Sequence, residues 1–200
     1  MSSKRIAVFG YGSLVSPASF AETLCREPGP VTPARLRGWR RRWTVGRDNR
    51  SAEKTFARPD GEVPPWIIGL NIEAAATEEL ANEEALAPNG ALLECSEAEL
   101  ERLDLREMRY RRVELDDAID APAGVDRVFA YTARDEHFYP EPPAGAVAMA
   151  PYMRAVEAAF RGLGEGQWEL FLQTTGPPPV ELIEPQLIRD EIPPGNPRGW

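Results

Sequence analysis

The chain of 200 residues is 42% hydrophobic and 28% charged, which is typical of a globular protein that buries a core without disulfides or metals. Its 23 basic and 32 acidic residues give a net charge of −9, which disfavours nucleic acid as a partner because phosphate groups repel acidic proteins. No apolar stretch approaches the ~20 residues of a membrane span. The N-terminal apolar run is interrupted by glycines and lacks a small-residue cleavage site, so we expect a cytoplasmic protein with no membrane partner.

The first predicted element is a buried strand at Arg5–Phe9, a short apolar run that ends at glycines. A helix follows, with Ser16 as its N-cap and Pro17 at its first position. The loosely alternating segment Val31–Val45 predicts one or two strands. Segment Arg47–Pro65 is polar and rich in proline and glycine, and we expect a long surface loop there.

The middle of the chain contains two further strands, predicted at Trp66–Ile72 and Gly90–Cys95. Between them lies the acidic, alanine-rich segment Glu73–Pro88, which we interpret as an inserted segment with one helix. The residues Ser96–Glu99 match a capping box, in which a serine hydroxyl and a glutamate carboxylate satisfy each other's backbone donors. The helix that this box begins is expected to end near Leu105.

Strands are also predicted at Tyr110–Leu115 and Val125–Thr132, with a turn at Ala121–Gly124 between them. Two helices are expected after them, at Pro151–Leu163 and at Glu165–Thr175. Strands outnumber the crossover helices that a doubly wound fold requires, so we expect an α+β fold around a mixed, barrel-like sheet with peripheral helices.

From residue 176 onward proline is frequent and no period is visible, so we expect a domain at 1–175 followed by an extended Pro-rich arm at 176–200. This arm wraps its own domain or a second subunit, and a homodimer through the arm is one expected partner. The apolar residues available for that contact are Leu182, Ile183, Leu187 and Ile188.

The segment Ala7–Val15 reads AVFGYGSLV and resembles the start of a dinucleotide-binding fingerprint. Gly10 and Gly12 fit that pattern, but Val15 and Ser16 stand where the third glycine is needed, and no P-loop lysine follows. Backbone N–H groups at such a strand end can still hold an anionic or carbonyl oxygen. The alternative is a tight strand-to-helix turn that binds nothing.

A family resemblance bears on this choice. The segment Val8–Leu14, VFGYGSL, resembles the signature of the γ-glutamylcyclotransferase superfamily, including its ChaC-like and AIG2-like branches. The segment Asn89–Leu115 is similar to the strand, helix and Leu-Asp…Glu…Tyr segment of that family. Leu36–Trp43, LRGWRRRW, is similar to the strand after the family's first helix, and Pro151–Leu172 is similar to the ChaC-like C-terminal helices.

The resemblance implies a mixed fold around a small barrel and a single catalytic glutamate, which is Glu107 in LDLREMRY. It implies that Tyr110 lines the substrate pocket and that no metal or nucleotide cofactor is needed. It also implies that a loop binds the γ-glutamyl group mainly through its backbone. The loop residues are Tyr11, Gly12, Ser13 and Leu14.

The chemistry needs few protein groups, because the α-amine of a γ-glutamyl amide attacks its own γ-carbonyl. One carboxylate, Glu107, takes a proton from the amine and returns one to the departing amine, which yields 5-oxoproline. Glu101 and Asp104 are the nearest competing acids. Ser13 is not expected to be a nucleophile, because the one histidine, His137, is distant in sequence.

Several interpretations stay open. The protein is expected to be an enzyme of this superfamily acting on a small γ-glutamyl molecule, but a non-catalytic binding or regulatory module on the same fold is an alternative, and a nucleotide-dependent enzyme is a weaker one. The leaving group of the substrate is not determined. Segment Ala74–Pro88 is longer than in the family and is a candidate to narrow or cover the pocket.

The arginine cluster at residues 40–42 and the two cysteines are interpreted as structural residues, not as site residues. Alternation along a strand puts Arg40 and Arg42 on one face and Arg41 on the other, and we expect these to be surface arginines of which at most part enters a pocket. Cys25 and Cys95 lack the spacing of metal ligands, so we expect two free thiols, with neither a zinc site nor a disulfide.

Overall fold

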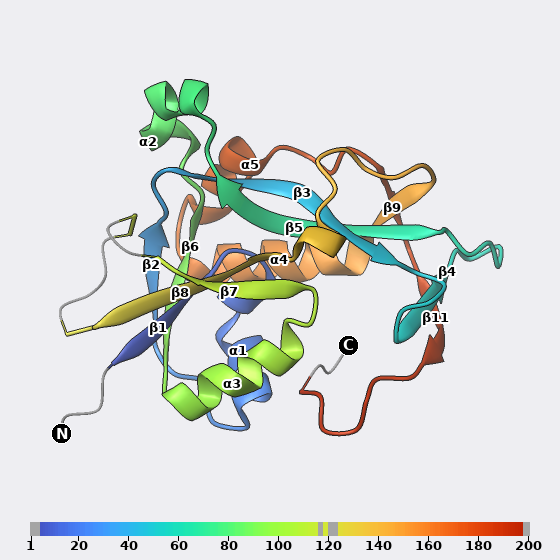
Figure 1. The fold of residues 1–200 in the computed structure, drawn as a ribbon, viewed down its shortest axis with the longest axis horizontal. Coiled ribbons are helices and arrows are strands. Elements are labelled where there is room, and N and C mark those ends of the chain that lie inside the picture. The colour runs from blue at the N-terminus through green and yellow to red at the C-terminus, as the bar shows by residue number, and fades with distance from the viewer. Residues whose placement is uncertain (1–4, 116–117, 120–123, 198–200) are drawn as a thin grey trace.

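The computed structural model describes residues 5–115, 118–119 and 124–197, and Figure 1 shows their arrangement. The strands are β1 (Ile6–Gly10), β2 (Val31–Arg35), β3 (Trp39–Asp48), β4 (Lys54–Ala57), β5 (Trp66–Ala74), β6 (Asn89–Cys95), β7 (Tyr110–Glu114), β8 (Arg127–Ala133), β9 (Ala146–Met149), β10 (Glu181–Ile183) and β11 (Gln186–Asp190). The α-helices are α1 (Pro17–Leu24), α2 (Glu83–Leu86), α3 (Glu97–Arg106), α4 (Ala150–Leu163) and α5 (Gln167–Thr175). Short 3₁₀ helices are η1 (Ser13–Val15), η2 (Thr77–Asn82) and η3 (Asp135–His137).

The larger sheet of the described residues has five strands in the order β2-β6-β1-β8-β7. Strand β1 lies at its centre, antiparallel to β6 and parallel to β8, which makes the sheet mixed. Every residue of β1 is buried, and this explains why its sequence is a continuous apolar run rather than an alternating one. The edge strand β2 contains Pro33, and an edge tolerates proline because one side of the strand needs no hydrogen-bond donor.

A second sheet has the order β10-β9-β5-β3, and β4 pairs with β11 in a two-stranded sheet. The two large sheets are joined where β8 meets β5: Thr132 Oγ1 donates to Ile72 O at 2.7 Å, and Ala133 N donates to Asn71 Oδ1 at 2.8 Å. Within the described residues the sheets do not close into a barrel. The expected α+β class with mixed sheets and peripheral helices is confirmed.

Helices α1 and α3 lie side by side against the larger sheet (Figure 1). Helix α1 begins as expected, with Pro17 at its first position and Ser19 N donating to Ser16 Oγ at 3.3 Å. The capping box of α3 is also present, because Ser96 N donates to Glu99 Oε2 at 2.7 Å. No helix in the described ranges is long and apolar enough to cross a membrane.

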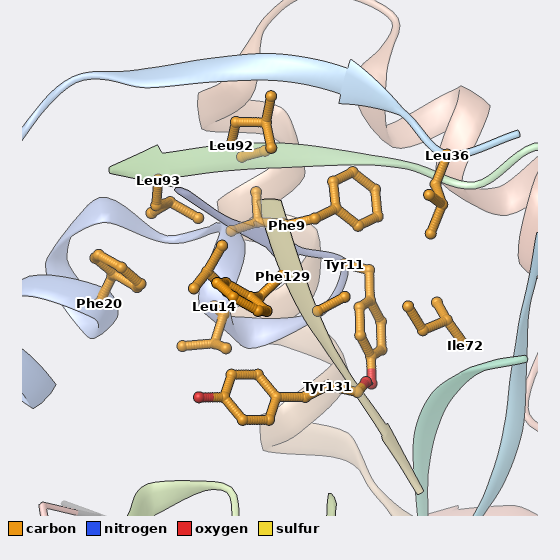
Figure 2. Close-up of a cluster of buried hydrophobic side chains, with 14 of the residues drawn as sticks. Phe9, Tyr11, Leu14, Phe20, Leu36, Ile72, Leu92, Leu93, Phe129 and Tyr131 are labelled. Carbon is orange, nitrogen blue, oxygen red and sulfur yellow. The ribbon is translucent and has the colours of Figure 1, made fainter. Parts of the chain in front are cut away.

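The core between the sheets and helices is shown in Figure 2. Phe9, Leu36 and Ile72 come from three different strands or strand ends and are almost fully buried. The ring of Tyr11 lies among them, and its hydroxyl points to the backbone of β8, where it donates to Tyr131 O at 2.5 Å (Figure 2). The residue at the start of the glycine turn is therefore anchored in the core.

The expected surface loop at Arg47–Pro65 is wrong in part. Strand β3 continues to Asp48, and β4 lies inside the segment. Asn49 is fully buried and holds the segment together: its Nδ2 donates to Phe56 O and Pro64 O, both at 2.8 Å, and its Oδ1 accepts from Phe56 N. The side chain of Asn49 thus holds the backbone of this segment together, which its composition did not indicate.

Other short elements also differ from expectation. Segment 73–88 contains the end of β5 and two short helices, η2 and α2, instead of one helix. Strand β9 was not predicted, since a strand of four residues gives little periodicity. The arm is extended as expected, and it adds β10 in parallel to β9 and β11 antiparallel to β4. Of the turn expected at Ala121–Gly124, residues 121–123 lie outside the described residues.

Candidate active site

A cavity of about 150 Å³ lies where the end of β1, the start of α1, the end of α3 and the middle of β5 meet. By this measure one water needs about 15 Å³, so the cavity is large enough for a small molecule. Its lining includes Tyr11, Gly12, Ser13, Leu14, Glu107, Tyr110 and Tyr152. All six residues that the sequence and the family resemblance singled out therefore line one space.

Close contacts around the turn at residues 10–15 explain why glycine stands at positions 10 and 12. A Cβ on Gly10 would lie 2.9 Å from the carbonyl carbon of Leu14, because the chain folds back on the end of β1. The turn is closed by Val15 N, which donates to Gly12 O at 3.1 Å. A Cβ on Gly12 would lie 2.8 Å from Tyr152 Oη, so a side chain there would fill the contact between the turn and α4.

Glu107 is the first residue beyond α3, and its side chain is 15% exposed. Its carboxylate lies 3.2 Å from Arg106 Nε. The guanidinium of Arg106 is itself fixed on α1, where it donates to Ser19 O at 2.9 Å, to Ser19 Oγ at 3.0 Å and to the hydroxyl of Thr23. Arg106 thereby holds the Glu107 carboxylate at the junction of α1 and α3, at the edge of the cavity.

Tyrosine side chains line the cavity together with this carboxylate. Tyr110 Oη donates to Leu70 O on β5 at 2.8 Å, which ties the start of β7 to the cavity wall. Burial raises the pKa of Tyr11 well above its ordinary value, and the charges of Tyr110 and Glu107 raise it further. Burial also raises the pKa of Tyr152, followed by the charge of Glu107, while a hydrogen bond from the backbone of Ser13 opposes the shift. The phenols of Tyr11 and Tyr152 are therefore neutral at physiological pH.

The competing acids are placed elsewhere. Asp104 accepts from Tyr131 Oη at 2.8 Å and pairs with Arg112 at 2.9 Å, and Glu101 is exposed on α3. Neither is among the described residues that line the cavity, and neither is His137. Glu107 is the acid beside the glycine turn. Glu22, which is exposed on α1, is the other carboxylate among the described lining residues.

The expectation of surface arginines at positions 40–42 is wrong for two of the three. Arg42 is exposed and pairs with Glu79 at 2.6 Å, but Arg40 and Arg41 are buried. Arg41 is 1% exposed because α5 packs over β3. Alternation along a strand separates its two faces, but it does not reveal that a helix covers one of them.

Arg41 connects the glycine turn to the C-terminal helix. Its Nη1 donates to Tyr11 O at 3.1 Å and to Asn89 O at 2.6 Å, and its Nη2 donates to Asn89 Oδ1 at 2.9 Å. It also donates to the hydroxyls of Thr174 and Thr175. Burial lowers the pKa of Arg41 well below its ordinary value. The residue binds the backbone that carries the site rather than the cavity.

Segment 74–88 does not reach the cavity, whereas the C-terminal arm does. No described residue of 74–88 lines it, so this segment does not narrow it as suggested. The arm does reach it: Pro197 lines the cavity, and Asn196 Nδ2 donates to Leu105 O at 2.8 Å at the end of α3. In Figure 1 the C-terminal segment accordingly returns from β11 toward α3.

Metal ligands are not gathered in this structure. No group of three His, Cys, Asp or Glu side chains within the described residues is placed to hold a metal ion. Cys25 and Cys95 are free thiols, the first exposed and the second buried. Burial raises the pKa of Cys95 to about 12, which makes it unreactive at neutral pH.

The cavity-wall residues that sequence reasoning did not single out include Arg106, Arg109 and Tyr152. Arg106 and Arg109 flank Glu107 in a charged run, where most side chains are solvated, so no sequence signal separated them from their neighbours. Tyr152 follows the proline that begins α4, a position that indicates a helix start and not a site.

The structure combines an α+β fold of mixed sheets with a glycine turn after the first strand and an acid after a mid-chain helix, which line one cavity. No protein-family model and no curated protein sequence matches this chain. Solved structures do match. One described as a gamma-glutamyl cyclotransferase is 16% identical and covers 84% of this chain and 86% of its own, with a TM-score of 0.52.

A second is the crystal structure of a gamma-glutamyl cyclotransferase specific to glutathione from yeast. It is 15% identical and covers 86% of this chain and 96% of its own, with a TM-score of 0.51. At these identities the likeness establishes the fold. This chain has the gamma-glutamyl cyclotransferase-like fold that its motifs resembled.

Proposed function

We propose that this protein cyclises a γ-glutamyl amide to 5-oxoproline and releases the amine, with Glu107 as general acid and base. One observation carries the proposal: the half-buried carboxylate of Glu107 and the glycine turn at residues 11–14 line the same cavity. The solved structures that share the fold are described as cyclotransferases of γ-glutamyl compounds, which supports the same class of reaction.

The reaction needs a folded substrate and a proton carrier. The α-amine nitrogen attacks the γ-carbonyl carbon, forming a C–N bond and an oxyanion, and Glu107 accepts the proton that the amine loses. Collapse of this intermediate breaks the original amide C–N bond, and Glu107 returns the proton to the departing nitrogen. Holding the γ-glutamyl chain in a ring-closing conformation removes most of the entropic barrier.

The glycine turn is suited to hold the substrate through its backbone. The hydrogen bonds that close the turn use the N–H groups of Val15 and Ser16, which donate to Gly12 O and Ser13 O. The amides at the start of such a helical turn have no acceptor within it. That of Ser13 donates to the Tyr152 hydroxyl, and we assign those of Gly12 and Leu14 to an anionic oxygen of the γ-glutamyl group. Tyr11, Ser13 and Tyr110 form walls of the same subsite.

The test is Glu107→Gln, which keeps the size of the side chain and removes its basicity. We expect the rate of 5-oxoproline formation, measured by mass spectrometry with a panel of γ-glutamyl compounds, to fall by about 10²–10⁴-fold. The matched control is Glu101→Gln on the exposed face of α3, which should retain full activity. Equal activity of the Glu107→Gln variant and the unmodified protein would rule out this assignment.

The alternative function is a non-catalytic small-molecule-binding or regulatory module that uses the same cavity. It is favoured if the unmodified protein binds γ-glutamyl compounds without releasing 5-oxoproline from any member of the panel. Cytoplasmic location, and the absence of nucleic acid and membrane partners, stay predictions from composition.

We further propose that the C-terminal arm forms a homodimer contact. Leu182, Leu187 and Ile188 are 45%, 48% and 56% exposed, which is unusual for large apolar side chains that lie close together in sequence. By contrast, Ile183 is buried against Ile67 and Val147, so one face of the arm is already fixed on its own domain.

A further inference from the structure

Arg109 is a buried cation in the cavity wall that the proposed reaction does not use. It lies two residues after Glu107, lines the cavity and is 8% exposed. Its Nη2 donates to the carboxylate of Glu53, whose side chain is also 8% exposed. Its Nη1 is buried and has no hydrogen-bond partner among the described residues.

An unsatisfied donor on a buried guanidinium is costly, because the group has lost water without gaining an acceptor. Arginine presents its donors in a fixed planar fork, so the ion pair with Glu53 satisfies one side of the group and leaves the other side oriented but empty. A ligand carboxylate would supply the acceptor that the protein does not.

Glu53 is held from the far side by the C-terminal arm. Glu191 N donates to Glu53 O at 2.6 Å, and Arg189 donates to the backbone of Ala52 at 2.9 Å. The guanidinium of Arg109 is thereby anchored through Glu53 to the two-stranded sheet of β4 and β11. Its position relative to the cavity is therefore set before any ligand binds.

Glu107 and Arg109 are two positions apart in the sequence and both line the cavity. Two residues of chain span at most about 7 Å, so both side chains start from neighbouring points of the cavity wall. In a γ-glutamyl amino acid, the carboxylate carbon of the second amino acid lies two bonds beyond the amide nitrogen that Glu107 must protonate. A substrate placed with this nitrogen at Glu107 has its carboxylate beside the adjoining part of the cavity wall, to which Arg109 belongs.

We propose that Arg109 binds a carboxylate on the carbon next to the departing nitrogen, so that this protein prefers γ-glutamyl amino acids over γ-glutamyl derivatives of neutral amines. This inference rests on the proposed function. It adds a specificity residue for the leaving group, separate from the glycine turn that holds the γ-glutamyl group.

The test compares two substrates that differ in one group, γ-glutamyl-alanine and γ-glutamyl-alaninamide. In the unmodified protein we expect kcat/KM to be at least about tenfold higher for the carboxylate, the discrimination typical of a lost charge-assisted hydrogen bond. The protein variant is the double substitution Glu53→Gln and Arg109→Gln, which removes the cation without leaving an unpaired buried carboxylate. Its ratio of kcat/KM for the two substrates should fall to about one.

Two further measurements keep the test decisive. The substrate ratio of the unmodified protein needs no variant, so a misfolded double variant, detected by circular dichroism, does not remove the test. Calorimetric binding of both compounds to Glu107→Gln protein measures the preference in the absence of turnover. Arg109→Lys should retain part of the preference, because it keeps the charge and loses the planar fork.

The outcomes separate this inference from the proposed function. Equal kcat/KM for both substrates, or a preference that survives the double substitution, overturns the role of Arg109 and leaves the cyclisation reaction standing. If γ-glutamyl-alanine binds more tightly than γ-glutamyl-alaninamide but neither yields 5-oxoproline, the Arg109 subsite is supported and the cyclisation reaction is overturned. Neither turnover nor binding of either compound overturns both.

Discussion

Replacing Arg41 by methionine removes a buried cation while keeping an unbranched side chain of similar length. The substitution breaks hydrogen bonds to three carbonyl oxygens, Tyr11 O, Asn89 O and Asn89 Oδ1, and to two threonine hydroxyls. It also removes the stacking of the guanidinium over Phe171, whose ring centroid lies 4.0 Å from Arg41 Cζ. The segment that loses its support is the glycine turn.

The expected loss follows from the three carbonyl bonds. A hydrogen bond to a charged group contributes about 1.5 to 3 kcal/mol, so three contribute at least about 4 kcal/mol. Relief of the desolvation of an unpaired buried cation offsets part of this. We expect the free energy of unfolding to fall by about 3 kcal/mol, a large share of the stability of a typical domain.

The assay is urea unfolding followed by tryptophan fluorescence, with the adjacent residue as the control. Arg42→Met removes an exposed arginine whose side chain is 48% exposed, and it should cost less than about 1 kcal/mol. Activity should also fall in the Arg41→Met variant, because Tyr11 O anchors the turn. Equal stability losses at the two positions would refute the reasoning that burial, and not charge, makes Arg41 important.

Three other outcomes are expected. Gly12→Ala should lower 5-oxoproline formation at least about tenfold, because its Cβ would lie 2.8 Å from Tyr152 Oη. Adding Tyr152→Phe should recover thermal stability. The control Gly29→Ala, whose Cβ meets nothing within 4 Å, should change neither activity nor stability. Folding raises the pKa of Cys95 to about 12, so the unfolded chain loses its thiol proton first and the free energy of unfolding falls as pH rises from about 9. This fall, measured by urea unfolding, should be shallower in Cys95→Ala. An identical pH dependence in the two proteins would contradict the buried thiol. Leu187→Glu should convert a dimer into a monomer in light scattering with unchanged stability, and a monomeric unmodified protein would contradict the dimer proposal.

Local patterns predicted most of the regular elements. The apolar run before Gly10, the cap at Ser16 and the capping box at Ser96 each concern residues a few positions apart, and the structure contains all three. Their physical basis is local: side-chain periodicity and the satisfaction of the first backbone donors of a helix. The resemblance of VFGYGSL to a known signature added the fold, which the solved structures confirm.

Elements whose existence depends on long-range packing were not predicted from local patterns. Strand β4 inside the expected loop is held by Asn49, and the strands of the arm have partners more than 30 residues away in sequence. A short strand carries too little periodicity to be recognised, because its existence depends on the ladder that its partner offers.

The sequence by itself determined where most of the longer strands and helices begin, that a bare glycine turn follows the first strand, and that Glu107 falls at a helix end. The tertiary structure decided which of many charged side chains are buried and what they face. Arg41, Arg106 and Arg109 look alike in a charged sequence, yet one supports the turn, one holds Glu107 and one lines the cavity. Their roles differ because burial and partners come from segments far away in the chain, such as the contact of Arg41 with Thr175 across 134 positions.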